Sequence, residues 1–141
     1  MELVKKKLSR HLKVSVKLII DTHLLLWAAA DTLPPKAIQY FENEENKLLF
    51  SSASIWEIVI KKGLKRSDFK VDPAALYIGL LENGYSEIPV TGRHTLFTAD
   101  LPAIHKDPFD RILIAQARAE GARLLTADRT LSHYPQVIWV R

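Results

Sequence analysis

KLIIDTHLLLWAAA, at residues 17–30, contains the pattern from which the architecture of the chain follows. Residues 17–20 form a short apolar run with the length and β-branching of a buried strand. The run ends at Asp21 and Thr22, either of which can cap a helix over residues 23–30. The stretch therefore predicts a strand that leads directly into a helix.

The same alternation continues along the chain. We expect strands at residues 47–51, 87–90, 123–127 and 137–140, and helical segments at residues 36–45, 52–62, 72–83, 91–100 and 107–120. Asp107 and Pro108 form the strongest helix start, because Asp accepts free amide hydrogens and Pro is tolerated at the first position. Pro89 weakens the strand at 87–90. Because parallel neighbours need crossover connections, this order predicts a single α/β domain with a mainly parallel sheet of about five strands flanked by helices.

The composition is typical of one soluble domain. The chain has 141 residues, of which 48% are hydrophobic and 26% charged, and it has no cysteine. This excludes a multidomain assembly, a disordered chain, a disulfide scaffold and a cysteine-ligated zinc or iron-sulfur site. Charged residues interrupt the most apolar region, at 14–30, so we expect no membrane span and no secretory signal. The cytoplasm is the expected compartment.

The positive charge is concentrated at the N-terminus. The formal net charge is +4, but residues 1–17 hold six Lys or Arg and one Glu, a net +5, which leaves −1 for residues 18–141. We therefore predict a basic N-terminal extension over residues 1–16 and a domain over residues 17–141. The alternative is an ordinary N-terminal helix.

Four acidic residues stand where ligand sites of parallel sheets form. Asp21 closes the first strand and Asp128 follows the strand at 123–127, whereas Glu57 and Asp110 lie early in two of the helices. Ligands bind beyond the carboxyl ends of strands in open α/β sheets. We therefore expect these four carboxylates to converge on one edge of the sheet.

Each of these acids also has a purely structural explanation. The two strand-end aspartates could cap the helices that follow them, and Asp110 could favour the positive end of a helix dipole. Glu57 could complete a capping box with Ser54 or pair with Lys61 one turn later. The apolar neighbours of Glu57 argue against an exposed capping role, because a carboxylate in such surroundings needs compensation.

A cluster of four carboxylates calls for a cation. Two unit charges about 4 Å apart repel by roughly 4 kcal/mol at an effective dielectric constant near 20. Either one acid takes up a proton or a divalent cation binds, and oxygen ligands favour Mg²⁺ or Mn²⁺ over Zn²⁺. Such an ion activates a water molecule and screens a phosphate, which suits the hydrolysis of phosphodiester bonds.

Four motifs carry a resemblance to a known family: LIIDTHLLLW (18–27), SIWEIVIKKGLKR (54–66), HKDPFDRILIAQARAEG (105–121) and LLTADRTL (124–131). With them, residues 17–141 resemble PIN-domain ribonucleases, particularly the VapC-like toxins of type II toxin-antitoxin systems. The resemblance implies a compact α/β nuclease domain, Mg²⁺- or Mn²⁺-dependent cleavage of RNA, a homodimer and an inhibitory cognate antitoxin. It places the catalytic and metal-binding acids of the family on Asp21, Glu57, Asp110 and Asp128.

Three neighbouring residues receive weaker assignments. Thr126 matches a hydroxyl position that often assists the acids in this family, although a strand threonine is as often structural. We interpret Asp107 as a helix cap rather than a metal ligand. His105 could orient the substrate or donate to Asp107, but a lone histidine near a helix start usually has no catalytic part.

RNA contact requires positive charge. The best candidates are the basic residues at positions 61–70, with Arg111 and Arg129 as further ones. The alternative is a solvated helix end whose Lys residues favour the negative end of the dipole. Trp27 and Trp56 could stack on bases, but we interpret them as core or dimer-interface residues.

Three competing functions remain. A phosphoacceptor receiver domain also places acids at strand ends, but it would want a paired acid at the first strand and a Lys near the last strands, and this pattern fits poorly. A catalytically silent module could receive a basic tail of a partner in its acidic pocket. A housekeeping RNA-processing nuclease would use the same chemistry without an antitoxin.

Overall fold

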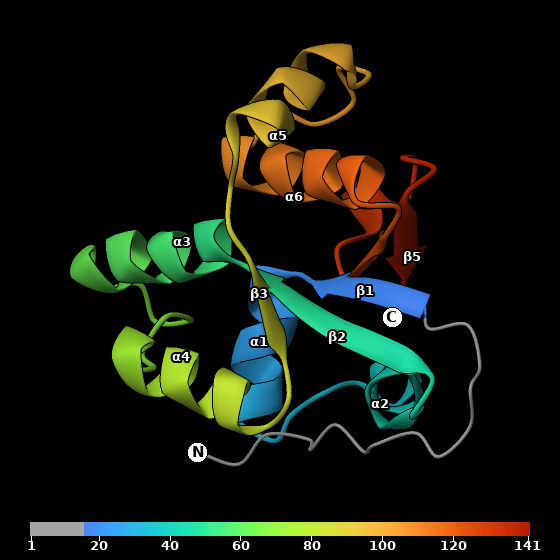
Figure 1. The fold of residues 1–141 in the computed structure, drawn as a ribbon. Helices are drawn as coiled ribbons and strands as arrows, with labels where there is room; N and C mark the ends of the chain where they lie inside the picture. The colour runs from blue at the N-terminus through green and yellow to red at the C-terminus, as the bar shows by residue number, and fades with distance from the viewer. Residues whose placement is uncertain (1–15) are drawn as a thin grey trace.

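The computed structural model describes residues 16–141. They form one parallel sheet of five strands in the order β3-β2-β1-β4-β5, with helices on both faces (Figure 1). The strands are β1 (Val16–Ile20), β2 (Asn46–Ser51), β3 (Ser86–Ile88), β4 (Arg123–Thr126) and β5 (Val137–Trp139). The expected α/β architecture is confirmed, and the sheet is wholly parallel among the residues that the structure describes.

The helices follow the predicted order. They are α1 (Thr22–Ala29), α2 (Pro35–Glu42), α3 (Ser52–Gly63), α4 (Pro73–Glu82), α5 (Gly92–Phe97) and α6 (Pro108–Ala119), with short 3-10 turns η1 (Thr98–Asp100) and η2 (Arg129–Leu131). α1, α2 and α4 lie on one side of the sheet, and α5 and α6 lie on the other (Figure 1). This arrangement buries both faces of the central strands.

Alternation along the strands builds two cores. In β1, Leu18 and Ile20 belong to the core under α1, α2 and α4, whereas Ile19 belongs to the core under α5 and α6. Successive side chains of a strand point to opposite faces, so the continuous apolar run at 18–20 fills both. Five buried hydrophobic residues in β2 and β4 repeat the pattern. The hydrophobic effect therefore fixes β1 as the central strand.

The strand order creates a switch point beside β1. The chain proceeds outward from β1 to β2 and β3, and then returns to place β4 and β5 on the other side of β1. Ile20 is paired with Leu125, and the amide of Asp21 donates to the carbonyl of Leu125 at 3.1 Å. Ligand crevices of parallel sheets form at such points. The ends of β1 and β4 are therefore held side by side.

Several predicted boundaries shift for local reasons. β3 ends at Ile88, one residue before Pro89, which cannot donate to the sheet. α2 ends at Glu42 rather than at residue 45. Gly121 follows α6 with a φ of 63°, a left-handed conformation that favours glycine. β1 already includes Val16, and residues 1–15, which hold most of the predicted basic extension, lie outside the described residues.

None of the helices in the described part of the chain is long and apolar enough to cross a lipid bilayer.

Candidate metal centre

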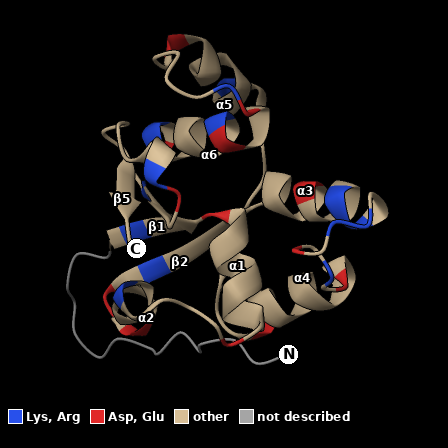
Figure 2. Ribbon diagram, turned by 180° about the vertical axis from the view of Figure 1, so that it is seen from behind, with Lys and Arg blue, Asp and Glu red and all other residues tan. Residues whose placement is uncertain are grey.

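A cavity of about 420 Å³ opens at the carboxyl edge of the sheet, and all four predicted acids line it. Asp21 comes from the end of β1, Glu57 from α3, Asp110 from α6 and Asp128 from the end of β4. Acidic segments at the end of β1, on α3 and at the start of α6 appear in red in Figure 2. The other lining residues are Thr22, His23, Trp27, Lys61, His105, Asp107, Ala127 and Arg141.

Asp21 is held by two hydrogen bonds at the end of the central strand. Its Oδ1 accepts from the amide of Leu24 at 2.9 Å, so the residue caps α1, and its Oδ2 accepts from the hydroxyl of Thr126. The residue is 5% exposed. Burial raises the pKa of Asp21 above its ordinary value, although the hydrogen bonds from Thr126 and Leu24 oppose the shift. The capping role therefore coexists with a place in the cavity.

Thr126 connects two of the acids. It is fully buried at the end of β4, donates its hydroxyl hydrogen to Asp21 and accepts from the amide of Asp128 at 3.0 Å. From the sequence, Thr126 could either assist the acids or be a structural residue of the strand. The structure shows that its hydroxyl fixes Asp21 relative to the segment that carries Asp128.

Glu57 lies in the cavity with a counter-ion. It is 4% exposed and forms an ion pair with Lys61, one helical turn further along α3. The alternative of a capping box with Ser54 is wrong, because Ser51 caps the helix and its hydroxyl accepts from the amide of Ala53 at 3.0 Å. The hydroxyl of Ser54 instead accepts from Thr22 at 2.9 Å. The buried carboxylate is thus compensated by a lysine.

Asp110 projects from the first turn of α6 toward His105. Its Oδ2 lies 2.7 Å from Nε2 of His105, and both side chains are about one quarter exposed. Burial raises the pKa of Asp110 to about 6; the charge of Asp107 adds to the shift and the bond with His105 opposes it. Asp107 itself caps the helix, as predicted, and accepts from the amide of Phe109 at 2.8 Å.

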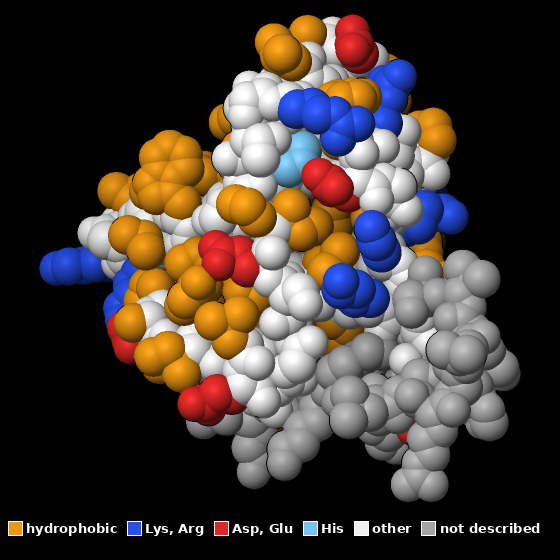
Figure 3. Space-filling model, in the orientation of Figure 1, with side chains coloured by type: hydrophobic (Ala, Val, Ile, Leu, Met, Phe, Trp, Pro, Cys, Tyr) orange, Lys and Arg blue, Asp and Glu red, His pale blue; other side chains and the backbone are white. Residues whose placement is uncertain are grey.

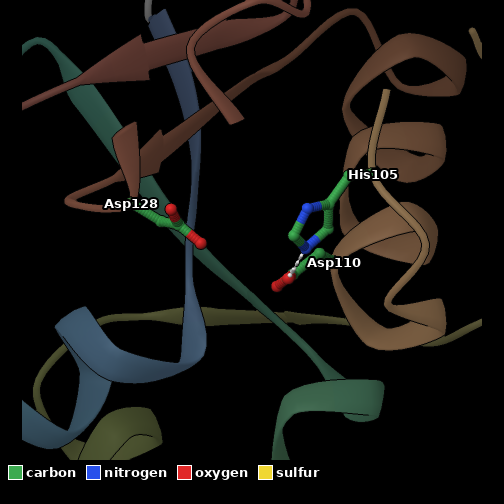
Figure 4. A group of neighbouring side chains, drawn as sticks. All are labelled: His105, Asp110 and Asp128. Carbon is green, nitrogen blue, oxygen red and sulfur yellow. Dashed lines mark hydrogen bonds and ion pairs between the residues drawn. The ribbon is translucent and has the colours of Figure 1, made fainter. Parts of the chain in front are cut away.

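Asp128 faces the Asp110 side chain across the cavity. Its Oδ1 accepts from the amide of Thr130 at 2.9 Å, so it caps η2 while its carboxylate is directed toward His105 and Asp110 (Figure 4). One ligand atom each of His105, Asp110 and Asp128 lie within 4.8 Å of one another. From the sequence alone, His105 is only a weak candidate for the site; the signal that points to it is its position five residues before Asp110.

The residues present fit a divalent cation. Carboxylate oxygens are the ligands of Mg²⁺ and Mn²⁺, and a first-row ion also accepts an imidazole nitrogen. The side chains of His105, Asp110 and Asp128 are close enough to share one ion after small side-chain adjustments. Asp21 and Glu57 line the same cavity and can hold water molecules of such an ion.

Positive charge reaches the cavity from two directions. Lys61 is the member of the predicted basic stretch that lines it, and Arg141 approaches from the segment after β5, where its guanidinium lies 5.4 Å from the ring of Trp27. Arg111, a predicted RNA contact, instead donates to main-chain carbonyls, among them that of Thr98 at 2.7 Å. The guanidinium of Arg129 lies 5.8 Å from the ring of Trp139.

The two tryptophans differ in environment. Trp27 is partly buried against the core and also lines the cavity. Trp56 is 62% exposed on α3 and meets the ring of Phe109 edge-on at 5.5 Å. Trp56 is therefore a surface residue rather than a core residue.

Comparisons with known proteins agree with this architecture. The model of the PIN domain family matches residues 18–137. Similar solved structures include VapBC2 from Rickettsia felis bound to a promoter DNA fragment, with 16% identity over 88% of this chain and 97% of that one and a TM-score of 0.66. DNA-bound VapBC from Salmonella typhimurium is 16% identical over 86% and 95% of the two chains, with a TM-score of 0.62.

A third similar structure is the PIN domain endonuclease Utp24, with 15% identity over 93% of this chain and 90% of that one and a TM-score of 0.54. No curated protein sequence matches the chain significantly. The three structural matches show the fold, and the family model covers most of the sequence together with all four acidic positions. This chain belongs to the PIN domain family.

Proposed function

We propose that this PIN domain is a Mg²⁺- or Mn²⁺-dependent endoribonuclease and the toxin of a type II toxin-antitoxin pair. One observation carries the proposal: carboxylates from four distant segments, at residues 21, 57, 110 and 128, line a single cavity at the switch point of the sheet. Membership in the PIN family and the likeness to the endonuclease Utp24 support nuclease chemistry. The neighbouring VapBC complexes support an antitoxin as partner.

The cavity offers separate groups for the ion, the water and the phosphate. Asp21, Asp110 and Asp128 would hold the metal, directly or through water, and Glu57 would be a ligand or position the attacking water. When bound, the ion lowers the pKa of water and screens the charge of the phosphodiester. Lys61, which pairs with Glu57 and lines the cavity, would contact a phosphate.

Cleavage of single-stranded RNA by the purified protein in Mg²⁺ or Mn²⁺ tests the proposal. Asp110→Asn should reduce the rate at least about a hundredfold, because it removes one charge from the site while keeping its shape. Asp31→Asn is the matched control, since Asp31 is exposed and its φ of 58° suits Asn equally well. Full activity of folded Asp110→Asn protein would contradict the assignment of this carboxylate.

The same measurements separate the competing functions. A silent interaction module would show neither RNA cleavage nor a rise in melting temperature with Mn²⁺. A housekeeping nuclease would cleave RNA, but its expression would not be toxic, and no neighbouring small gene would relieve toxicity. We expect growth arrest on expression and relief by the product of an adjacent gene.

An exposed apolar surface supports association with another chain. Large apolar side chains with between about one third and two thirds of their surface exposed lie along α3 and α4, where orange side chains gather in Figure 3. We call this the α3–α4 apolar face; its residues are Trp56, Val59, Ile60, Leu64, Ile78 and Leu81. Contiguous apolar surface of this kind marks protein interfaces. We infer that it forms the interface of the homodimer.

A further inference from the structure

The imidazole of His105 lies next to the carboxylates of the candidate metal centre. His105 Nε2 lies 2.7 Å from Asp110 Oδ2, and ligand atoms of these two residues and of Asp128 lie within 4.8 Å of one another (Figure 4). Two ligands on opposite sides of an octahedral ion with bonds of about 2.1 Å are separated by roughly 4.2 Å. Shifts of a few tenths of an ångström at each side chain would bring all three to one ion.

Hydrogen bonds hold the main chain of His105 at both its amide and its carbonyl group. Its amide donates to the hydroxyl of Tyr134 at 3.0 Å, and its carbonyl accepts from Arg111 at 3.1 Å. Tyr134 is buried and donates in turn to the carbonyl of Pro102 at 2.9 Å. The imidazole is therefore presented to Asp110 and Asp128 by fixed main chain, as the ligand of a preorganised site would be.

The second histidine in the cavity is arranged differently. Nε2 of His23 lies 3.2 Å from Asp68, and its ring packs edge-on against Phe69 at 5.4 Å. Both contacts direct it away from the group formed by His105, Asp110 and Asp128. Of the two histidines that line the cavity, His105 is thus the one placed to bind an ion.

We propose that His105 is a direct ligand of the catalytic ion, together with Asp110 and Asp128, and that the centre therefore prefers Mn²⁺ to Mg²⁺. Nitrogen ligands stabilise first-row transition ions, whereas Mg²⁺ takes oxygen ligands almost exclusively. The inference deepens the proposed function and rests on it. The alternative within the same geometry is a positioning role, in which His105 only donates a hydrogen bond to an Asp110 carboxylate that binds the ion.

Pulsed electron paramagnetic resonance of the Mn²⁺-loaded full chain distinguishes these roles, because a directly bound nitrogen modulates the Mn²⁺ spin echo. We expect ¹⁴N modulation in the wild-type protein and a change to the ¹⁵N pattern when histidine is labelled with ¹⁵N. The modulation should be retained in His23→Ala and lost in His105→Ala. Calorimetry should show that His105→Ala weakens Mn²⁺ binding about tenfold or more and Mg²⁺ binding by less than roughly threefold.

Each outcome decides a different point. Mn²⁺ binding without nitrogen modulation in the wild type would overturn the ligand role of His105 and leave the proposed nuclease intact. Absence of any Mn²⁺ or Mg²⁺ binding would contradict the proposed function itself. If His105→Ala fails to fold, the labelled wild type and His23→Ala still test the ligand role of His105. Loss of the modulation in His23→Ala would assign the bound nitrogen to His23 and overturn the proposal.

Discussion

Asp110 is the residue whose environment has the clearest energetic consequence. Its pKa is raised to about 6, mainly by burial, so the folded apo protein binds a proton there more tightly than the unfolded chain does. The stabilisation from this group is fully present below about pH 4, which is the ordinary pKa of Asp. It is lost as the pH rises through about 6. An unliganded site of this kind destabilises the protein at neutral pH.

Replacing this charge should therefore stabilise the apo protein. We expect Asp110→Asn to raise the free energy of unfolding by about 1–2 kcal/mol at pH 7, and the gain to disappear near pH 4. Urea unfolding in the presence of a chelator, from pH 4 to pH 7.5, measures the difference. If the gain in unfolding free energy did not change with pH, ionisation of Asp110 would not be its source.

The hydroxyl of Thr126 can be tested by two nearly isosteric changes. Thr126→Val leaves the buried Asp21 carboxylate and the amide of Asp128 without this partner, and should cost about 1–3 kcal/mol of unfolding free energy. Thr126→Ser keeps the hydroxyl and should retain most of the stability and the metal affinity. Chemical denaturation and Mn²⁺ titration of both variants check this expectation. A larger loss in Thr126→Ser than in Thr126→Val would assign the role to the methyl group instead.

At the scale of elements, α3 and α5 show how caps and ion pairs set the position of a helix. α3 is capped by Ser51 and directs Glu57 and Lys61 into the cavity. α5 has only six residues and is held to the end of α6 by the buried His94. Nδ1 of His94 accepts from the amide of Thr91 at 3.0 Å, so Nε2 carries the hydrogen and donates to Glu120 at 2.7 Å.

This contact predicts a pH dependence for the docking of α5. The hydrogen bond from His94 lowers the pKa of Glu120, so its contribution is present above the ordinary pKa of Glu and is lost as the pH falls through the lowered value. Glu120→Gln should therefore be less stable than the wild type at pH 6, with a difference that shrinks below about pH 4. Thermal unfolding from pH 3 to pH 7 measures it.

Glu82→Gln provides the control, because Glu82 is exposed at the end of α4. It should follow the wild type throughout the pH range. The interpretation of α5 would fail if Glu120→Gln and Glu82→Gln behaved alike.

At the scale of the whole molecule, the order of the strands determines where the site lies. The α3–α4 apolar face remains exposed beside it. The switch between β1 and β4 brings Asp21 and Asp128 to the same crevice. α3 contacts α1, α4 and α6 at this edge, and its outer side carries the α3–α4 apolar face. An apolar groove between α3 and α6, lined by Trp56, Ile60 and Phe109 among others, continues from this face.

We expect the α3–α4 apolar face to mediate dimerisation. Trp56→Glu should convert the dimer to a monomer, because it places a charge within the face at an exposed position outside the core. Light scattering coupled to size-exclusion chromatography measures the mass. Val16→Glu, at a half-exposed position at the start of β1, should remain dimeric. A wild-type protein that is monomeric at about 100 μM would exclude the dimer and leave the antitoxin as the occupant of the face.

The strands, most of the caps and the strand-end positions of two acids follow from the amino-acid sequence alone. The apolar run of β1 and the Asp107-Pro108 helix start are local signals, because strand preference and capping act within a few residues. Packing of distant segments brings Thr126 to Asp21, and Asp128 to His105 and Asp110. These relations depend on how helices and loops pack, through contacts such as Tyr134 with the His105 amide, which link residues far apart in the chain and leave no periodic pattern.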